Sequence, residues 1–448
     1  MPSRREFARL FAAGGSAALF LHPAFADKTK PFVPSPVVNE GFWKTVREQF
    51  LMPPGIAVLN AANLCPSPAP VLEAMYKTTR ELDREPSSSY RAGLLDVKEA
   101  TRRKLADFLR ASPDEIVITR NTSESNNLVS SGLDLKSGDE VVVFSDNHPS
   151  NKTAWLEKGK RFGYSMRTID IVNPHPGADY YLEAAARQLG PRTKVLAFSH
   201  LTNTVGDLFP ARELCRLARE REVLTLIDGA QSFGLLDVDL SDIQPDFYTG
   251  SAHKWPCGPK EAGVLYINKR SHAKIWPSIY SAFPGATGIS KSFECFGQRD
   301  DGAMAAFGAA IDFQVKVGRK NIEDRARQIG QAFVQELGKI SDVKLWTHAD
   351  PQRTGPVVTF RPGELKVQKL AQVLFEKEGV ICAVREGSDR PGIRFSPHFY
   401  NSHREVERIA AAIRRYMASS IARRFSKPPA VDVAVLLRPV LIDQGGQR

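Results

Sequence analysis

Short continuous apolar runs alternate with longer stretches of helical periodicity along most of the chain. Between about residues 100 and 270 the apolar runs are Ile116–Thr119, Val141–Phe144, Val195–Phe198, Leu224–Ile227, Phe247–Thr249 and Gly263–Ile267. Runs of this kind, separated by helices, are typical of a mostly parallel sheet that is covered on both faces. We therefore expect an α/β fold whose central sheet carries helices on each side.

The pattern changes after about residue 300. An amphipathic helix bearing Leu370 and Leu374 lies between two predicted strands, Val357–Phe360 and Val380–Val384. A capping box, Ser402 with Glu405, precedes a last helix. We predict a smaller α+β domain here. The expected division is a segment over 27–85, a large domain over 86–300, a small C-terminal domain over 301–425 and a tail over 426–448.

Residues 1–26 have the three regions of a signal peptide. Arg4-Arg5 precedes an apolar run over 10–21, and Ala24-Phe25-Ala26 supplies small residues at a cleavage site. The paired arginines match the twin-arginine type and predict export to the periplasm by the twin-arginine machinery. The alternative is a basic amphipathic helix. The apolar run is shorter than the about 20 residues that cross a bilayer, so we expect no stable membrane insertion.

Charge and cysteine content narrow the classes of function. The net charge of +11 is spread along the 448 residues, and no nucleic-acid module is recognisable, so we expect no nucleic-acid partner. The excess of positive charge favours anionic substrates. The 5 cysteines stand at wide spacings without a CxxC pair. They predict neither a disulfide framework nor a metal site.

Polar residues follow several of the predicted strands, where ligands bind in parallel sheets. Thr122 and Ser123 open a helix after the first strand and suit either a phosphate or an ordinary N-cap. His148 and Asn203 follow the next two strands.

Two further residues suggest a cofactor with a pyridine ring. Asp228 ends a buried strand, where a carboxylate can keep a pyridine nitrogen protonated or can cap the next helix. Lys254 follows another strand and precedes Trp255. Partial burial and a cationic neighbour would lower the pKa of this lysine and let it form a Schiff base. The alternative for Lys254 is a surface charge.

These motifs, taken in order from about Leu59 to Ile413, resemble the class V aminotransferase family of fold-type-I pyridoxal phosphate enzymes. That family includes cysteine desulfurases and isopenicillin-N epimerase-like proteins. The resemblance implies the fold of a PLP-dependent transferase, pyridoxal 5′-phosphate as cofactor, and a homodimer with shared active sites.

The resemblance also implies a role for each matching residue. Lys254 carries the cofactor as an aldimine and then moves protons at the substrate Cα. Asp228 pairs with the ring nitrogen, Gln231 bonds the phenolic oxygen, and His148 stacks on the ring. The implied phosphate ligands are Ser123, Ser251 and His253, with Thr122 beside them. Asn203 lies near the phenolic oxygen and the substrate carboxylate. Arg394 binds the α-carboxylate, which suits its planar fork.

The chain departs from the family pattern at two places. Gln298 stands where the family often has a threonine that reaches the phosphate of the partner subunit, so this contact is in doubt, although glutamine can still donate. Residues 385–392, just before Arg394, contain no cysteine, and Cys382 lies in a predicted strand. Desulfurase chemistry, which needs a thiolate on that loop, is therefore disfavoured.

The favoured hypothesis is a tailoring enzyme that transforms an amino acid or amine at Cα, by transamination or a related reaction. A second hypothesis is a C–S or other β-lyase, or an epimerase, since the stretch from Phe283 to Phe296 resembles the epimerase-like branch. A third is an exported binding protein without catalysis. The substrate and any amino acceptor are left open.

Overall fold

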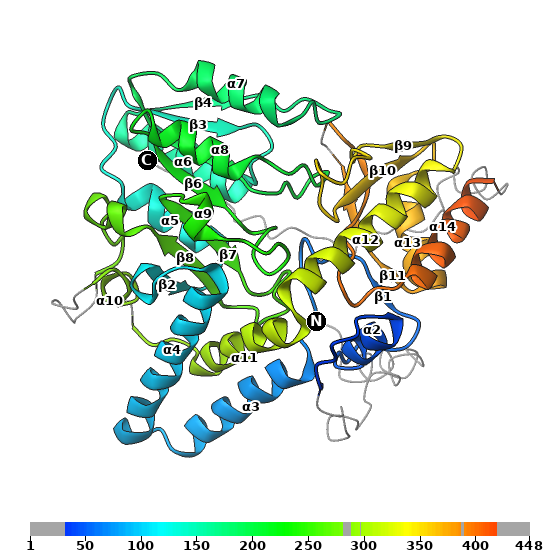
Figure 1. Cartoon of the computed structure of the whole chain (residues 1–448), viewed down its shortest axis with the longest axis horizontal. Coiled ribbons are helices and arrows are strands. Elements are labelled where there is room, and N and C mark those ends of the chain that lie inside the picture. Colours follow the sequence, from blue (N-terminus) through cyan, green and yellow to red (C-terminus); the bar gives the residue numbers. More distant parts are fainter. Residues whose placement is uncertain (1–31, 281–287, 296, 387–388, 419–448) are drawn as a thin grey trace, which may run out of the picture.

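The computed structural model describes residues 32–280, 288–295, 297–386 and 389–418. The predicted signal peptide, the tail over 426–448 and the loop that contains Phe283 lie outside these residues. A large region with one sheet lies beside a smaller region with another (Figure 1). Among the described residues no helix is long and apolar enough to span a membrane.

The large region is built on a seven-stranded sheet with the order β2-β8-β7-β6-β5-β3-β4. The strands are β2 (Ile116–Thr119), β3 (Glu140–Phe144), β4 (Ser165–Ile169), β5 (Thr193–Ser199), β6 (Leu224–Asp228), β7 (Phe247–Ser251) and β8 (Gly263–Ile267). Strand β8 runs antiparallel to both neighbours, and the other pairs are parallel. The expected mostly parallel sheet is confirmed. Edge strand β4 escaped prediction because its residues are largely polar and exposed.

Both faces of this sheet are covered, as the continuous apolar runs predicted. On one face Val141, Val195 and Leu226 pack with Leu128 and Trp155 of the neighbouring helices. On the other face Val142, Leu196 and Ile227 belong to a core that also contains Leu105 and Phe307. Adjacent residues of one strand therefore enter two different cores, which fixes which side chains point toward which helix layer.

Most helices before residue 318 lie around this sheet, whereas the first described one, α2, lies beside the small region (Figure 1). They are α2 (Glu40–Arg47), α3 (Ala69–Arg84), α4 (Ser88–Leu109), α5 (Thr122–Gly132), α6 (Pro149–Phe162), α7 (Ala178–Gln188), α8 (Ala211–Arg219), α9 (Leu240–Ile243), α10 (Ile289–Phe293) and α11 (Asp301–Val317), with 3₁₀ turns at Pro113–Glu115 and Lys269–Lys274.

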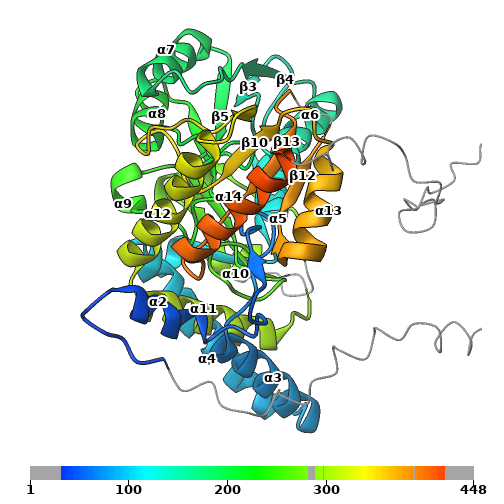
Figure 2. The same cartoon turned by 90° about the vertical axis from the view of Figure 1, so that its right-hand side faces the viewer.

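The small region has a four-stranded antiparallel sheet with the order β12-β13-β10-β9. Its strands are β9 (Val343–Leu345), β10 (Val358–Pro362), β12 (Ala383–Arg385) and β13 (Gly392–Phe395). Helices α12 (Arg319–Gly338), α13 (Val367–Glu378) and α14 (His403–Ala418) lie side by side over it (Figure 2). Their apolar residues share one core with the strands. The predicted capping box is confirmed, since Ser402 and Glu405 exchange hydrogen bonds of 2.7 and 3.2 Å.

One predicted strand of this region is divided in two. The stretch Val380–Val384 breaks at Cys382 into β11 (Val380–Ile381), which pairs with β1 (Ala57–Val58), and β12, which pairs with β13. A single run of apolar letters does not reveal that its two ends join different sheets. As a result, β1 of the N-terminal segment is hydrogen-bonded to the small region. The chain just after β1 passes close to Arg394.

Candidate active site

The site lies at the carboxyl ends of the parallel strands, where β13 of the small region approaches them. Asp228 ends β6, and Ser251 ends β7 just before Lys254. Hydrogen bonds join α5 to Asp228 and to Ser251, and they join Arg394 of β13 to Asn203. The charges of Asp228, Lys254 and Arg394 all influence the pKa of His148. Residues that are far apart in the sequence and were predicted from separate motifs are therefore neighbours.

Asp228 is buried, with 3% of its surface exposed, and both carboxylate oxygens are engaged. Oδ1 accepts a hydrogen bond from the backbone N–H of Ala230 at 3.1 Å, and Oδ2 accepts one from Nδ2 of Asn126 at 3.1 Å. Asn126 is in turn held by the hydroxyl of Thr249, which donates to its Oδ1 at 3.3 Å. These contacts fix the direction in which the carboxylate points.

Sequence reasoning missed Asn126. It stands four residues after Thr122 on α5, so the two side chains share one face of that helix. That spacing was the only signal in the sequence. It would have sufficed once Thr122 was placed at the site.

Lys254 is half-buried at the turn that follows β7. Burial lowers the pKa of its amine to about 8; Arg394 acts in the same direction and Asp228 opposes it. A lysine with this pKa is neutral in about a tenth of the molecules at pH 7, far more than at its ordinary pKa of 10.5, and a nucleophilic amine must be neutral. Lys254 is therefore equipped for imine formation and is not the surface charge that was the alternative.

The predicted phosphate ligands gather at the N-terminus of α5. The backbone N–H and the hydroxyl of Thr122 both lie 2.8 Å from Oγ of Ser251. Asn121 is the N-cap of α5, and its side chain accepts a hydrogen bond from the N–H of Glu124. Neither Thr122 nor Ser123 therefore acts as the N-cap. Ser123 is exposed and lines a pocket of about 470 Å³ with Arg120.

His253 contributes a ring nitrogen that faces no protein partner. Its Nδ1 is buried and has no hydrogen-bond partner among the described residues. Burial lowers the pKa of His253 to about 4, with Lys254 and Lys260 acting in the same direction. The imidazole is thus neutral at ordinary pH and can donate or accept one further hydrogen bond.

The residues predicted to hold the ring are His148 and Gln231. His148 caps α6, where its Nδ1 accepts from the N–H of Ser150 at 3.2 Å, and burial lowers its pKa. The Gln231 amide donates from Nε2 to the carbonyl of Ala62 at 3.0 Å and accepts at Oε1 from the indole of Trp255 at 2.8 Å. Trp255 is a second residue at the site whose part in it the sequence did not predict.

Arg394 comes from β13 and is 5% exposed. Its guanidinium donates to the backbone carbonyl of Asn203 at 2.9 Å and to Oδ1 of Asn60 at 3.2 Å. Its Nε is buried without an acceptor among the described residues. Burial lowers the pKa of Arg394 to about 10, and Arg385 acts in the same direction. Asn203 therefore contacts Arg394 through its backbone carbonyl and not through its side chain.

Gln298 stands apart from the other predicted residues. It is exposed, and its Oε1 accepts from Arg91 at 2.9 Å. No contact among the described residues joins it to Lys254 or to the N-terminus of α5.

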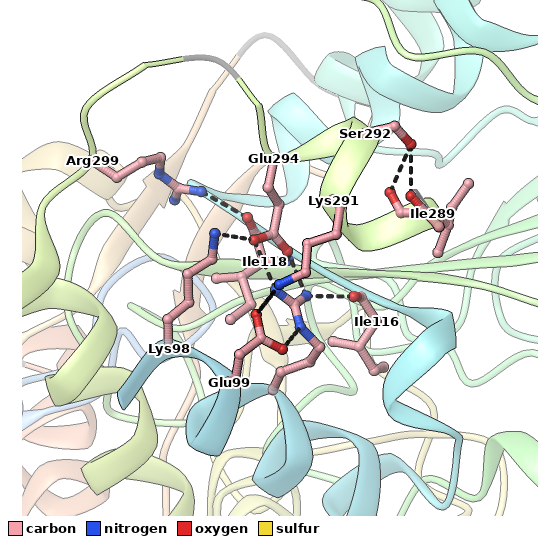
Figure 3. A network of polar contacts seen from close by, with 11 residues as sticks. Lys98, Glu99, Ile116, Ile118, Ile289, Lys291, Ser292, Glu294 and Arg299 are labelled. Atoms are coloured by element: carbon pink, nitrogen blue, oxygen red, sulfur yellow. Dashed lines mark hydrogen bonds and ion pairs between the residues drawn. The ribbon is translucent and has the colours of Figure 1, made fainter. Parts of the chain in front are cut away.

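The segment that carries Gln298 is anchored to edge strand β2 by a buried network (Figure 3). Glu294 accepts from the N–H of Ile118 at 2.6 Å and pairs with Lys98 at 2.5 Å and with Arg102 at 2.5 Å. Arg299 donates to the carbonyl of Ile118 at 2.7 Å. The network therefore sets where Gln298 emerges at the surface.

The polar groups at this site fit a phosphorylated pyridine aldehyde. His253 has a buried ring nitrogen without a partner, α5 presents its N-terminus, and a buried carboxylate and a lysine of lowered pKa stand nearby. Thr122, Ser251 and His253 would hold the phosphate, Asp228 the ring nitrogen and Lys254 the aldehyde carbon. Pyridoxal phosphate combines these three features.

Comparison with known proteins agrees with this fit. The family model for class V aminotransferases matches residues 58–409. An isopenicillin N epimerase from Amycolatopsis lactamdurans is 31% identical over 390 residues, covering 83% of this chain and 98% of the relative. A probable cysteine desulfurase from Methanothermobacter thermautotrophicus is 28% identical over 79% of this chain and 93% of the relative.

Solved structures of the same fold are also similar. A mutant of C-DES with glycine covalently linked to its PLP cofactor has a TM-score of 0.76 and 24% identity, covering 82% of this chain and 98% of that chain. An apo cysteine desulfurase from Thermococcus onnurineus has a TM-score of 0.77 and 24% identity, covering 86% and 99%. The chain therefore belongs to the class V aminotransferase family, has the fold-type-I architecture and is a pyridoxal phosphate-dependent enzyme.

Proposed function

We propose that this enzyme acts at the Cα of an amino acid or amine, by transamination or a related tailoring reaction. The observation that carries the proposal is the placement of Lys254, whose amine has a pKa of about 8 and shares its surroundings with Asp228 and Arg394. A lysine of this kind can take a proton from Cα and return it. The bound cofactor supplies an electron sink for the pair left at carbon.

The other residues at the site bind the substrate and the cofactor. Arg394 binds and orients the substrate carboxylate, and one available donor is its Nε–H, which has no acceptor within the described part of the chain. With the cofactor bound, Asp228 would hold a positive charge on the ring nitrogen, and His148 would pack against the ring face. By fixing the carboxylate, Arg394 would determine how the substrate Cα is presented to Lys254 and to the cofactor.

An epimerase or a C–S lyase is the second candidate, and relatives carry names of both kinds. An epimerase uses the same proton transfer at Cα. Desulfurase chemistry is less favoured because the half-buried Cys382 is a poor nucleophile, since burial raises the pKa of its thiol to about 12. Residues 385–392 supply no other thiol.

The test is exchange of the Cα proton in deuterated water. The holoenzyme and a Lys254→Ala variant are incubated with a panel of amino acids, and the Cα–H signal is followed by proton NMR. We expect exchange with at least one amino acid in the wild type and none in the variant. Keto-acid formation supports transamination, inversion supports epimerisation, and pyruvate with sulfide supports the lyase. Equal exchange by the variant would contradict the role of Lys254.

We also propose that the enzyme is exported through the twin-arginine machinery to the periplasm and works as a homodimer. Support for export is the order of Arg4-Arg5, the apolar run and Ala24-Phe25-Ala26. Support for the dimer is the exposure of two large aromatic residues, Trp276 and Tyr280, next to the pocket that Ser123 lines. Replacing Arg4 and Arg5 by lysine should retain the protein in the cytoplasm, and light scattering of the purified protein should give twice the chain mass.

A further inference from the structure

Trp255 follows Lys254 directly and is completely buried. Its indole Nε1 donates to Oε1 of Gln231 at 2.8 Å, while Nε2 of the same amide donates to the carbonyl of Ala62 at 3.0 Å. An indole N–H can only donate and a carbonyl can only accept. The two neighbours therefore dictate which end of the amide is oxygen and which is nitrogen, and a flipped amide would lose both bonds.

The backbone of Trp255 is held as firmly as its side chain. Its carbonyl accepts from Nε2 of His398 at 2.7 Å and from Nε2 of Gln314 at 2.7 Å. The His398 ring also stands edge-on to the indole, with centroids 5.0 Å apart and planes at 81°. Burial lowers the pKa of His398 to about 3, so this imidazole stays neutral and donates from Nε2 to the carbonyl. The indole thus has a defined position before any ligand binds.

We propose that Trp255 is a positioning residue that fixes the Gln231 amide so that its second Nε2 hydrogen is aimed at the phenolic oxygen of the cofactor. Only one of the two Nε2 hydrogens is used by Ala62, so the other is the donor that remains. The inference rests on the proposed contact between Gln231 and the cofactor. The positioning by Trp255 explains why Gln231 would present an N–H donor, and not its carbonyl oxygen, to the cofactor.

The consequence can be measured in the ground state of the holoenzyme. A donor to the phenolic oxygen withdraws negative charge from it, and this charge helps to hold the proton on the adjacent nitrogen of Lys254. Without the indole, Oε1 of Gln231 is left buried and unpaired, and the amide is free to turn. The phenolic oxygen then loses its donor, and the nitrogen of Lys254 keeps its proton to higher pH.

The experiment is a pH titration of the visible absorption band of purified holoenzyme. For Trp255→Phe we expect the midpoint to rise by roughly 0.5 to 1 pH unit, the equivalent of one net hydrogen bond. Trp155→Phe is the matched control, because Trp155 is also completely buried and its Nε1 has no partner among the described residues. Its midpoint should stay at the wild-type value.

Two further variants make the result decisive. Gln231→Ala tests the contact itself and should raise the midpoint as much as Trp255→Phe does. If Gln231→Ala shifts the midpoint and Trp255→Phe stays within about 0.2 pH unit of wild type, the positioning role is overturned. If Gln231→Ala causes no shift, the assigned contact between Gln231 and the cofactor has failed. Should Trp255→Phe not fold, benzothienylalanine placed at this position by nonsense suppression keeps the shape without the N–H and must give the same shift.

Discussion

The two halves of the active site are prepared to different degrees. On the large-domain side, Asp228 and Gln231 each make two hydrogen bonds within the protein, and Thr122 is joined to Ser251. On the small-domain side, Arg394 also makes two hydrogen bonds, but its guanidinium and that of Arg385 each keep a buried Nε without an acceptor among the described residues. The difference indicates that the groups assigned to the cofactor ring are preorganised, whereas the substrate half, like Nδ1 of His253 at the phosphate, has nitrogens that await a ligand.

The largest effect should follow from disturbing the preorganised half. In Asp228→Asn the side chain can still accept from Ala230, but the negative charge opposite the ring nitrogen is gone. We expect kcat to fall by about 10³-fold, since loss of a buried charge partner costs several kcal/mol. Steady-state kinetics on any substrate found by proton exchange would measure this. A loss below tenfold would mean that the carboxylate does not hold the charge of the ring.

Disturbing the substrate half should act on binding more than on chemistry. Arg394→Gln keeps a donor but removes the charge, and kcat/KM should fall by about 10²-fold, mainly through KM. The holoenzyme without substrate should still show its visible cofactor band, with only a rise in the pH midpoint of that band, because the charge of Arg394 also helps to lower the pKa of Lys254. A variant that loses its cofactor spectrum would show that the two halves are not separable in this way.

The lowered pKa of Lys254 predicts a dependence of stability on pH in the cofactor-free protein. Unfolded lysine, with its ordinary pKa of 10.5, binds a proton that the folded protein releases near pH 8. The free energy of unfolding should therefore rise as the pH increases from about 8 to about 10.5. Lys254→Met should flatten this rise. Urea unfolding at several pH values in that window provides the measurement, and equal slopes in both proteins would contradict the burial of the amine.

The smallest effect is expected at Gln298, which lies outside both halves of the active site within a single chain. If the proposed dimer brings Gln298 to the partner's phosphate, Gln298→Ala should weaken cofactor binding by about fivefold, the value of one neutral hydrogen bond. Arg91→Ala removes the hydrogen bond that this side chain makes among the described residues and serves as the control. Unchanged affinity in Gln298→Ala would remove Gln298 from the cofactor ligands.

The sequence predicted those parts of the fold that produce a local pattern of apolar and polar residues. Buried strands such as Val141–Phe144 were placed correctly because a parallel sheet covered on both faces needs continuous apolar runs. The polar edge strand Ser165–Ile169 has no such run and was missed. The division at Cys382 depends on which sheet each half joins, and no local pattern encodes that.

The same distinction holds at the site. Asp228 and Lys254 were found because Asp228 ends a strand and Lys254 stands in the turn after one, and these positions are visible in the sequence. Asn126 and Trp255 were missed in their roles because they act on other side chains through long-range hydrogen bonds. Such contacts appear only when the chain is folded.

The central claim is that Lys254 is the residue that carries pyridoxal phosphate, and reduction of the holoenzyme with borohydride tests it directly. After proteolysis, mass spectrometry should find the reduced pyridoxyl phosphate group on the peptide that contains Ser251 to Trp255, with the modified side chain at Lys254. Protein produced with ample vitamin B6 that yields this peptide unmodified, or that carries the group on a different lysine, would contradict the account.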